Sequence, residues 1–509
     1  MVALEAVLEI GSTGIRLMAC EITGLGTWNV IDRSEMPVPI GSDVFTTGYV
    51  SKETILQCIK ILKRYKEQLN GWAIEENHIQ VIATSALREA RNRDTVLDRI
   101  LVKTGFRVKV IDGIEENRLM YIAVLDTLKE SLPTLREHSS VIIEIGGGST
   151  ELMLMDHGKM AAVHSLRLGT VIIEQNQQTA LRTQKDAHRF LEEFIRNTGV
   201  NLSTELKLER IKTFITMGSE ILLAAHSCGT KLSDRIYSIT RENFFSFVSE
   251  VQDYTPEECM ARFKISYNDA KLFGVGLLTY KLFLNLTSAD EIIVTDTSIR
   301  DGIILSRISA PNAQLNQEFF SQIVASARNL GKRYFFDEAH ANHVRYTALT
   351  LFDAMQKELG VSEHGRLLLE IAALLHDVGT YIRAGDHELH SEYIISHSDI
   401  FGLNKDDMNI ISQVAKYHRG SKSLYGEAAF SALARNDRVL VLKLSAILRV
   451  ADALDRSHSQ KIKKLIPELR GDNMILRVEG TQDTNLERIA LEEKGDLFES
   501  VFGYKLLLN

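Results

Sequence analysis

A glycine turn that follows an acidic residue occurs twice in this chain. One copy is the run Glu-Ile-Gly-Ser-Thr from Glu9 to Thr13, and the other is the run Glu-Ile-Gly-Gly-Gly-Ser-Thr from Glu144 to Thr150. Each copy lies between two apolar runs, a pattern that predicts strand, tight turn and strand. Glycine has no Cβ atom, so the backbone N–H groups of such a turn can converge on an anion. A single copy is also compatible with a plain hairpin, but a plain hairpin does not need the acid. The repetition therefore predicts a duplicated architecture that holds a phosphate group between its two halves.

The polar residues of the two turns form the candidate phosphate cradle. The hydroxyls of Ser12, Ser149 and Thr150 can add hydrogen-bond donors to those of the backbone. Cleavage of a phosphoanhydride needs such donors and cations around the phosphoryl oxygens, together with a base that orients the attacking water. The turn residues that we expect to bind substrate are Gly11, Ser12, Thr13, Gly146, Gly147, Gly148 and Ser149.

The composition narrows the class of protein. The chain has 509 residues, of which 45% are hydrophobic and 25% are charged, as in ordinary soluble globular proteins. Its net charge of −8 argues against general nucleic-acid binding, which usually needs a basic surface. No apolar stretch approaches the roughly 18 uncharged residues of a membrane span, and the N-terminus lacks the basic start of a signal peptide. The four cysteines are neither clustered nor spaced as Cys-x-x-Cys. We therefore expect a cytoplasmic protein with reduced thiols and no membrane partner.

The pattern of strands and helices changes twice along the chain. Residues 1–125 alternate strands with helices, and residues 126–308 repeat this α/β pattern with the second glycine turn near their start. The clearest linker is the segment from Ala310 to Ala313. Residues 312–465 are helical by period, and residues 466–509 return to short alternating segments. We therefore expect two α/β lobes, an all-α domain and a small C-terminal α/β segment.

Seven segments of the two lobes, in this order, carry a family resemblance. They run from Glu9 to Leu17, Ala83 to Asn92, Ile111 to Arg118, Glu144 to Leu152, Ser165 to Gly169, Met217 to Ser219 and Thr295 to Gly302. Together they resemble the exopolyphosphatase and guanosine pentaphosphate phosphatase family. The resemblance implies an actin-like (ASKHA, ribonuclease H-like) fold of two lobes, with the terminal phosphate of the substrate in the cleft between them. It also implies a homodimer, and inorganic polyphosphate or guanosine pentaphosphate or tetraphosphate as the ligand.

The same resemblance implies roles for single residues. Glu116 is the implied general base, although a carboxylate at the start of a helix is also favoured by the helix dipole alone. Glu151 is implied to orient water or to position a metal. Ser85 and Arg88 follow a predicted strand, and Arg88 would place a fixed positive charge on the leaving polyphosphate. Arg16 is a second candidate for that charge, on the strand that leaves the first turn.

The chain departs from the family at the acids of the two turns. Both turns begin with glutamate, Glu9 and Glu144, where the family has aspartate. The longer side chain moves the carboxylate by about one C–C bond, and a displacement of roughly 1 Å in such a site can cost on the order of a hundredfold in rate. One interpretation is a site re-spaced around Mg²⁺ or Mn²⁺. The other is a cleft that binds its ligand but hydrolyses it slowly, which Thr13 and Thr297 favour because the family usually has asparagine and glycine there.

The helical region carries a second set of metal-binding side chains. His376-Asp377 ends an apolar helix, with Gly379 as the expected C-cap. The order of histidines and aspartates resembles the HD phosphohydrolase domain, which many longer family members carry. Imidazole and carboxylate ligands suit Fe, Mn, Co or Zn better than Mg. The resemblance implies one metal ringed by His343, His376, Asp377 and Asp452, and a second held by His390 and His418.

Three further histidines fit this array less well. His340 and His387 lie near it in the sequence, but Glu388 stands where some relatives place another histidine, which puts the second metal in doubt. His458 fits no motif, so we expect it to be a surface residue.

Three functions therefore remain open. The first is a phosphatase that releases orthophosphate from polyphosphate or guanosine pentaphosphate in the interlobe cleft. The second is a metal-dependent phosphohydrolase in the helical domain, with the front lobes as a polyphosphate or alarmone sensor. The third is a binding module without catalysis. We favour the first because Glu116 and the full cradle are present.

Overall fold

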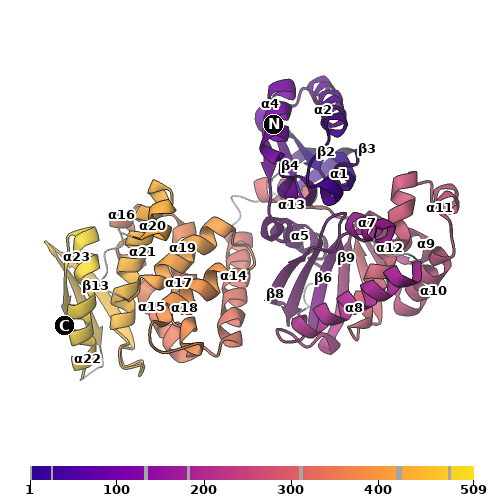
Figure 1. Ribbon diagram of the computed structural model, residues 1–509. Coiled ribbons are helices and arrows are strands. Elements are labelled where there is room, and N and C mark those ends of the chain that lie inside the picture. The colour runs from indigo at the N-terminus through magenta and orange to yellow at the C-terminus, as the bar shows by residue number, and fades with distance from the viewer. Residues whose placement is uncertain are drawn as a thin grey trace. The chain divides into compact units, whose positions relative to one another are not determined.

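The computed structural model describes residues 3–24, 27–130, 136–179, 184–308, 313–419, 427–479 and 483–509. The chain forms two compact units, Met1–Glu318 and Phe319–Asn509 (Figure 1). The expected linker lies outside the described residues except for Ala313, which begins helix α14 (Ala313–Arg333). None of the helices in the described ranges combines the length and the apolarity that crossing a membrane requires.

Two sheets that share a set of five strands in the same arrangement form the framework of the first unit. In each set, three strands that are consecutive in the sequence pair antiparallel. Two further strands, parallel to the first of these three, extend the sheet from its edge. The first sheet has the order β3-β2-β1-β4-β5, with β1 (Ala3–Ile10), β2 (Gly14–Gly24), β3 (Thr27–Pro37), β4 (Ile79–Ala83) and β5 (Val108–Val110). The second has the order β10-β11-β12-β9-β6-β7-β8, with β6 (Ser139–Ile145), β7 (Thr150–Asp156), β8 (Lys159–Leu166), β9 (Ile211–Met217), β10 (Thr230–Ser233), β11 (Ile236–Thr240) and β12 (Glu291–Thr295). The expected duplication is confirmed, and both glycine turns join antiparallel strands.

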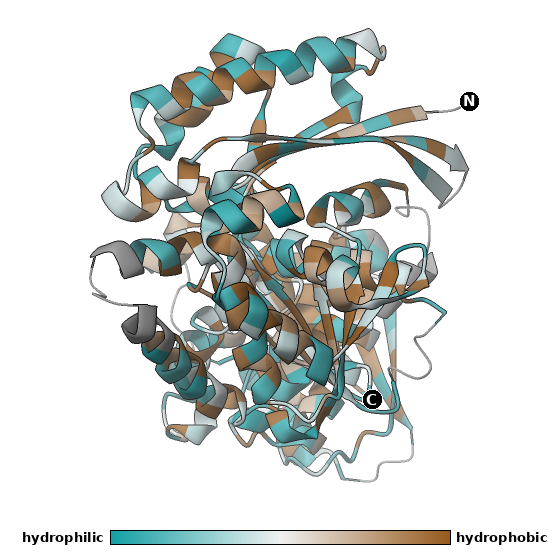
Figure 2. Cartoon of the chain, turned by 90° about the vertical axis from the view of Figure 1, so that its right-hand side faces the viewer, coloured by the Kyte–Doolittle hydropathy of each residue, from teal (hydrophilic) through white to brown (hydrophobic). Residues whose placement is uncertain are grey.

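Helix α2 (Lys52–Gly71) shows how the sequence period places a helix in the first lobe. Ser51 caps the helix by accepting a hydrogen bond from the N–H of Thr54 at 3.2 Å, as the sequence predicts. Its buried residues recur every three or four positions and join the core beneath the first sheet. The resulting mixture of apolar and polar residues along the helices can be followed in Figure 2. The other helices of this lobe are α1 (Ile40–Thr47), η1 (Glu76–His78), α3 (Ser85–Glu89) and α4 (Arg93–Thr104).

The helices of the second lobe are arranged around α12 (Tyr267–Asn285), which contacts each of its neighbours. Tyr280 of α12 is buried and accepts a hydrogen bond from the N–H of Ile145 at 3.1 Å, while its hydroxyl donates to the carbonyl of Met217 at 2.9 Å. These two bonds fix the ends of β6 and β9 next to the second glycine turn. The neighbours of α12 are α7 (Thr170–Thr179), α8 (Gln184–Leu202), α9 (Ser219–Cys228), α10 (Arg241–Gln252) and α11 (Pro256–Phe263), and the 3-10 turn η2 (Leu208–Arg210) precedes β9.

Two helices cross between the lobes. Helix α5 (Gly113–Thr127) follows the first sheet but contacts β7 and β8 of the second. Helix α13 (Ile299–Ile308) follows the second sheet but packs on β1, where Ile303 and Ile304 share a core with Val7. The crossing is tight, because a Cβ atom on Gly302 would lie 2.1 Å from the carbonyl oxygen of Leu119. The expected boundaries therefore assign α5 to the first lobe and α13 to the second, but each helix packs against the sheet of the other lobe.

The second unit is a helical bundle with a small sheet at its C-terminal end, as the sequence pattern predicts. Helix α21 (Arg435–Ala453) lies at its centre and contacts α15, α17, α19, α22 and α23. The helices are α15 (Glu338–Ala354), α16 (Gln356–Leu359), α17 (Glu363–Leu375), η3 (Val378–Tyr381), α18 (His387–Ser396), α19 (Lys405–Lys416), α20 (Ala428–Ala432), α22 (Asn485–Lys494) and α23 (Asp496–Phe502). The sheet has the order β13-β14-β15, with β13 (Lys464–Arg470), β14 (Asn473–Glu479) and β15 (Lys505–Leu508).

The expected role of Gly379 as a helix C-cap is wrong. Helix α17 runs through Leu375 into η3, and Gly379 does not have the positive φ of a left-handed cap. A Cβ atom on Gly379 would instead lie 2.2 Å from the carbonyl oxygen of His387 and 2.4 Å from the nitrogen of Ser391. The missing side chain therefore lets α18 approach the end of α17.

We predict that Gly302→Ala weakens the α5–α13 crossing. The added methyl group has to displace the backbone of Leu119, so the free energy of unfolding should fall by at least about 2 kcal/mol, as expected for overpacking. Urea denaturation followed by circular dichroism measures the change. Gly71→Ala is the matched control, because a Cβ atom there meets nothing within 4 Å. Equal midpoints for the two variants would contradict a tight crossing.

Candidate functional site

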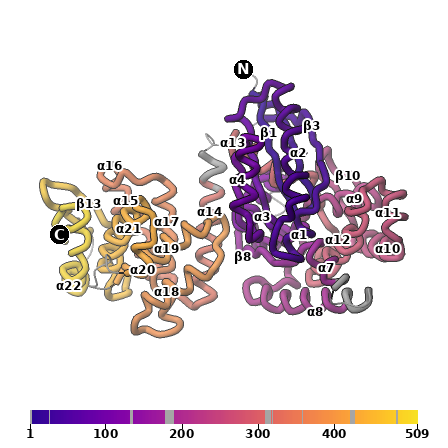
Figure 3. The backbone as a smooth tube through the Cα atoms, turned by 45° about the horizontal axis from the view of Figure 1, so that its top comes forward, coloured from indigo at the N-terminus to yellow at the C-terminus, as the bar shows by residue number. Residues whose placement is uncertain are grey.

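The two glycine turns meet in space, and the start of α3 joins them. The hydroxyl oxygens of Ser12 and Ser85 lie 3.3 Å apart. A Cβ atom on Gly147 would lie 2.8 Å from the Cβ atom of Ser12, and one on Gly148 would lie 2.6 Å from the hydroxyl oxygen of Ser85. The three helices next to this meeting point, α1, α3 and α7, gather in Figure 3, with α1 in contact with both others. The glycines are needed because any side chain would separate the two turns.

The second turn is held by hydrogen bonds to its carbonyls, and within the described residues most of its backbone N–H groups have no acceptor. The carbonyls of Gly146 and Gly147 accept hydrogen bonds from the N–H groups of Thr170 and Val171, at 2.9 and 3.0 Å. Within the described part of the chain, the N–H groups of Gly147, Gly148 and Ser149 have no hydrogen-bond acceptor. Successive N–H groups without acceptors are the arrangement that binds anions in backbone nests.

A cleft of about 530 Å³ opens at these turns and is lined by both lobes. Arg88, Gly148 and Thr150 are the expected cleft residues that do not line it, and the hydroxyl of Thr150 donates to the carbonyl of Leu168 instead. Two residues that the sequence analysis did not single out, Glu220 and Arg300, do line it; Arg300 lies inside a family segment and Glu220 directly follows one. The expected residues that the structure brings together in the lining are Glu9, Gly11, Ser12, Thr13, Arg16, Ser85, Glu116, Glu144, Gly146, Gly147, Ser149 and Glu151.

The duplicated acids have opposite surroundings. Glu9 faces Arg16 across β1 and β2, with 3.3 Å between Oε1 and Nη1, and Arg300 lies 3.4 Å from its other oxygen. Glu144 faces Glu151 across β6 and β7 instead. Like charges directly opposite each other destabilise a sheet. Among the described residues, Glu144 has no hydrogen bond or ion pair through its side chain, whereas Glu151 accepts from Asn117 and Ser165, each at 2.7 Å.

Burial and mutual repulsion raise the pKa of the acids in the second turn. Burial raises the pKa of Glu144 to about 8, and the charges of Glu9 and Glu116 add to the rise. Burial likewise raises the pKa of Glu151 to about 8, with Glu116 again contributing. The cleft therefore favours the protonated form of both acids at neutral pH, unless a cation binds beside them.

Glu116 lies in the first turn of α5 and is paired with Arg88. The Nη1 atom of Arg88 donates to the carboxylate of Glu116 and, at 2.7 Å, to the carbonyl of Ile111. Burial raises the pKa of Glu116 to about 7, while Arg88 acts in the opposite direction. Arg88, which we expected to face the substrate, thus pairs with Glu116, the expected general base. Arg16 is engaged as well, by Glu9, by Glu35 at 2.9 Å and by the hydroxyl of Thr13.

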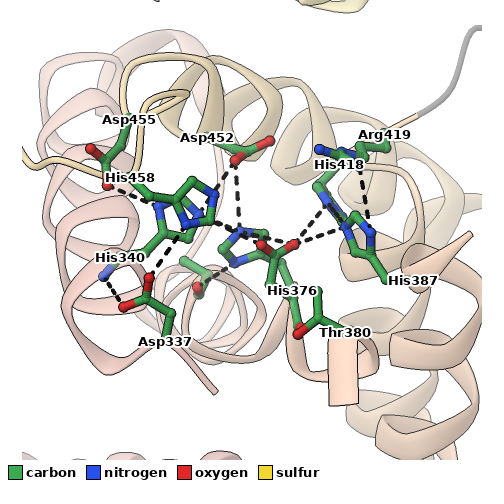
Figure 4. Close-up of polar contacts among 12 residues, drawn as sticks. Asp337, His340, His376, Thr380, His387, His418, Arg419, Asp452, Asp455 and His458 are labelled. Atoms are coloured by element: carbon green, nitrogen blue, oxygen red, sulfur yellow. Dashed lines mark hydrogen bonds and ion pairs between the residues drawn. The ribbon is translucent and has the colours of Figure 1, made fainter. Parts of the chain in front are cut away.

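The helical unit has a separate cluster in which imidazoles from several helices converge (Figure 4). The Nε2 atoms of His340 and His376 are 3.2 Å apart, and those of His387 and His418 are 3.3 Å apart. Asp377 lies between the two pairs, with Oδ1 at 3.0 Å from His387 and 3.3 Å from His418, and with Oδ2 at 3.8 Å from His340. Asp452 of α21 approaches the first pair, at 3.6 Å from His340 and 3.8 Å from His376.

The structure changes the expected membership of this cluster. His343 and His390 lie outside it, and His340 and His387 occupy it instead. His340 and His343 are three residues apart on α15, as are His387 and His390 on α18. Side chains three residues apart on a helix point about 60° apart around its axis. The Nε2 atom of His343 is buried without a hydrogen-bond partner. Relative spacing in the sequence did not reveal which histidine of each pair faces inward.

His458 and Lys494 are two members that the sequence analysis missed. His458, expected to be an unrelated surface residue, is half-exposed but stacks on His340, with ring centroids 3.7 Å apart. Lys494 reaches from α22 and forms an ion pair with Oδ2 of Asp452. No motif marks either residue, because both depend on how the C-terminal segment folds back onto α21.

The pKa values of both aspartates of the cluster are held low by their neighbours. Burial alone would raise the pKa of Asp377, but the charge of His376 and hydrogen bonds from His387 and His418 hold it well below its usual range. Burial also opposes ionisation of Asp452, and His340, His376 and Lys494 lower its pKa well below the usual range. The cluster therefore holds two carboxylates in their charged form inside a helical core.

The chain is similar to proteins of one family along nearly its whole length. The Ppx/GppA phosphatase family matches residues 22–310, and domain III of the Ppx/GppA phosphatases matches residues 324–498. A guanosine-5'-triphosphate,3'-diphosphate pyrophosphatase of Pseudoalteromonas translucida is 22% identical over 514 residues, which cover 99% of this chain and 98% of that protein. One of Photobacterium profundum is 22% identical and covers 87% of this chain and 86% of that protein.

Solved structures of the family resemble the first unit. The Ppx/GppA family member of Aquifex aeolicus has a TM-score of 0.50 at 24% identity, covering 61% of this chain and 99% of that chain. An exopolyphosphatase of Cytophaga hutchinsonii has a TM-score of 0.53 at 20% identity, covering 60% and 98%. This likeness confirms the actin-like fold. The helical unit matches the family's own domain III, so its HD-type character stays a prediction. The chain belongs to the Ppx/GppA phosphatase family, and it is a hydrolase.

Proposed function

We propose that the interlobe cleft hydrolyses the terminal phosphoanhydride bond of inorganic polyphosphate or of guanosine pentaphosphate and releases orthophosphate. The observation that carries the proposal is that unpaired backbone N–H groups of the second turn and the carboxylates of Glu116, Glu144 and Glu151 line one cleft. The names of the relatives, a guanosine-5'-triphosphate,3'-diphosphate pyrophosphatase and an exopolyphosphatase, support both substrate classes.

The second glycine turn would hold the terminal phosphoryl group. The N–H groups of Gly147 and Ser149 have no acceptor within the described residues, both residues line the cleft, and the hydroxyls of Ser12 and Ser85 meet beside them. Fixed donors aimed at phosphoryl oxygens stabilise the charge that they carry in the transition state, without reorganisation during the reaction. The hydrogen bonds from the start of α7 to the carbonyls of Gly146 and Gly147 hold the turn in this conformation.

Glu116 would act as the general base. A base with a pKa near 7 is poised to accept a proton from water at neutral pH, and burial raises the pKa of Glu116 to about 7. Arg88 would hold the carboxylate in place and stabilise its ionised form. Glu151, anchored by Asn117 and Ser165, would orient the attacking water or a bound cation from the opposite strand.

The cleft fits a divalent cation. Glu144 is an unpaired carboxylate opposite Glu151, and two facing carboxylates in a buried site are a set of hard oxygen ligands that suits Mg²⁺ or Mn²⁺. Glu144 would hold the ion together with Glu151, whereas Glu9 already has Arg16 and Arg300 as partners. Such an ion neutralises charge on the phosphoryl oxygens. The extra methylene of Glu144 is then part of a re-spaced site.

The direct test compares phosphate release from the two substrates. The purified full-length chain is incubated with Mg²⁺ or Mn²⁺ and either long-chain polyphosphate or guanosine pentaphosphate, and orthophosphate is measured over time. We expect metal-dependent release from at least one of them. Binding of both substrates without any release would favour a non-catalytic sensor and contradict the proposal.

We predict that Glu116→Gln lowers kcat by about a hundredfold or more and changes KM little, because the water loses its proton acceptor while the cradle stays intact. Glu115→Gln is the matched control. Glu115 is the adjacent acid of the same helical turn, but it pairs with Arg118 at 2.6 Å. Steady-state kinetics should give near-normal turnover for this control. Equal losses in the two variants would point to damage of α5 and not to a general base.

We predict that Glu144→Gln stabilises the metal-free protein at alkaline pH. The pKa of Glu144 is raised to about 8 in the folded protein, so its stabilising effect is complete below about pH 4.5, the pKa of an ordinary glutamate, and is lost as the pH rises through 8. The variant should therefore exceed the wild type by at least about 1 kcal/mol at pH 9.

Melting curves with chelator at pH 5 and pH 9 measure this difference, which should be absent at pH 5. The exposed Glu209→Gln is the control, and it should track the wild type at both pH values. Saturating Mg²⁺ should restore the wild type at pH 9. A difference of the same size at both pH values would show that ionisation of Glu144 is not its source.

A further inference from the structure

We propose that Asn117 is a positioning residue of the cleft, which holds Glu151 in a fixed place relative to Glu116, the proposed general base. The proposal deepens the proposed function and rests on it. Asn117 is only 1% exposed and does not line the cleft, whereas both acids do. Its effect on a substrate therefore has to pass through another residue.

The side-chain amide of Asn117 donates two hydrogen bonds. Its Nδ2 atom donates to Oε2 of Glu151 at 2.7 Å and to the carbonyl oxygen of Gly113 at 2.9 Å. A backbone carbonyl only accepts, so the bond to Gly113 fixes which way the amide points. Among the described residues, no donor reaches its buried Oδ1 atom. An acceptor without a partner costs stability, which an apolar residue at this position would avoid.

Glu151 is fixed from two sides. Ser165, its cross-strand partner on β8, donates to Oε1 at 2.7 Å, and Asn117 donates to Oε2. Within the described part of the chain Glu151 forms no ion pair, whereas Glu9 faces Arg16. An amide and a hydroxyl are neutral donors. They therefore orient Glu151 without adding a charge of their own, and the acid stays available to a water molecule or a cation.

The anchors are needed because Glu151 faces Glu144 across β6 and β7. Two carboxyl groups that face each other repel once both are ionised. A side chain of Glu151 without anchors would then turn away from its neighbour. A displacement of about 1 Å in a reacting site can cost on the order of a hundredfold in rate, so the bond from Asn117 bears directly on turnover.

Asn117 also links Glu151 to the proposed base, because it follows Glu116 on α5. Successive side chains of a helix point about 100° apart. Glu116 consequently reaches Arg88 of α3 in the first lobe, while Asn117 reaches Glu151 of β7 in the second. One turn of α5 thus contacts a side chain of each lobe. A rotation of the helix that moved the base would have to break the bond to Glu151.

The start of α5 lies close enough to the second sheet for this link. A Cβ atom on Gly113 would lie 2.5 Å from the hydroxyl oxygen of Ser165 and 3.5 Å from Oε2 of Glu151. The missing side chain therefore lets α5 approach β7 and β8, both of which it contacts. Asp112 caps the helix by accepting a hydrogen bond from the N–H of Glu115 at 2.8 Å. The helix turn that carries the base is thus held by its cap, by the glycine contact and by Asn117.

Steady-state kinetics of the full-length chain test the proposal. Asn117→Ala removes both donated bonds, and Asn117→Leu removes them while it keeps nearly the same shape. We predict that kcat falls by about tenfold or more in both variants, the usual loss when a hydrogen-bond partner behind a metal-binding group is removed. KM should change little, because the N–H groups of the second turn are untouched. A residue that only fills space would leave Asn117→Leu at the kcat of the wild type.

Asn92→Ala is the matched control. Asn92 bonds through its amide to the backbone of Val50, at 2.9 and 3.0 Å, and does not line the cleft. The substitution removes the same side chain from the same unit and should leave kcat unchanged. Circular dichroism verifies that each variant is folded. If Asn117→Ala does not fold, Asn117→Leu decides the question.

A second measurement does not depend on turnover. Mn²⁺ is titrated into the metal-free protein, and the free ion is followed by electron paramagnetic resonance. Both Asn117 variants should bind Mn²⁺ about tenfold more weakly in the cleft than the wild type does, and Asn92→Ala should match the wild type. The helical unit is identical in all these proteins, so a difference in affinity reports the first unit.

The outcomes separate the two proposals. A wild type that releases no phosphate from either substrate contradicts the proposed function. In that case weaker Mn²⁺ binding by both Asn117 variants supports the positioning role, and unchanged binding overturns it. An active wild type with Asn117→Leu at wild-type kcat and wild-type Mn²⁺ affinity overturns the positioning role and leaves the proposed function standing. An equal loss of kcat in Asn92→Ala also overturns it, because loss of an amide far from Glu151 would then have the same effect.

Discussion

The backbone contact between the second glycine turn and Gly169, which directly precedes α7, is the constraint on which the cleft depends. A Cβ atom on Gly169 would lie 2.3 Å from the carbonyl carbon of Gly147. At this distance the first N–H groups of α7 reach the carbonyls of Gly146 and Gly147. A peptide unit points its C=O and N–H groups in opposite directions, so fixing the carbonyls on α7 leaves the N–H groups for a ligand. The unpaired N–H groups of the turn thus follow from a packing contact between glycines and from the helix start that this contact admits.

The two duplicated lobes differ in what faces the acid of their glycine turn. The same strand position carries Glu9 opposite Arg16 in the first lobe and Glu144 opposite Glu151 in the second. The first acid is neutralised by the protein, and the second is left for a cation that the protein does not supply. Two carboxylates facing each other in a buried cleft destabilise the metal-free fold. A bound ion would offset this cost, as the function proposed for the cleft requires.

The sequence predicts the framework better than it predicts the partners of each side chain. The sequence correctly predicts a strand, a turn and a second strand around Glu9–Thr13 and around Glu144–Thr150, because local periodicity and glycine determine these elements. The sequence did not predict that Arg88 pairs with Glu116, since these residues lie on different helices. The sequence analysis selected His343 and His390 in place of His340 and His387, because the order of residues along the chain does not show which side of a helix each one occupies. A rotation of about 60° around the helix axis decides which imidazole faces inward. Lys494 was missed because its contact depends on the packing of α22 against α21.

The two sites share one electrostatic principle and differ in ligand chemistry. Each gathers acceptors beyond what nearby cations neutralise: carboxylates in the cleft, and imidazoles with two carboxylates in the helical unit. Hard oxygen ligands suit Mg²⁺ or Mn²⁺, while imidazole ligands bind later first-row metals more tightly. The two clusters therefore differ in the kind of cation that would balance them.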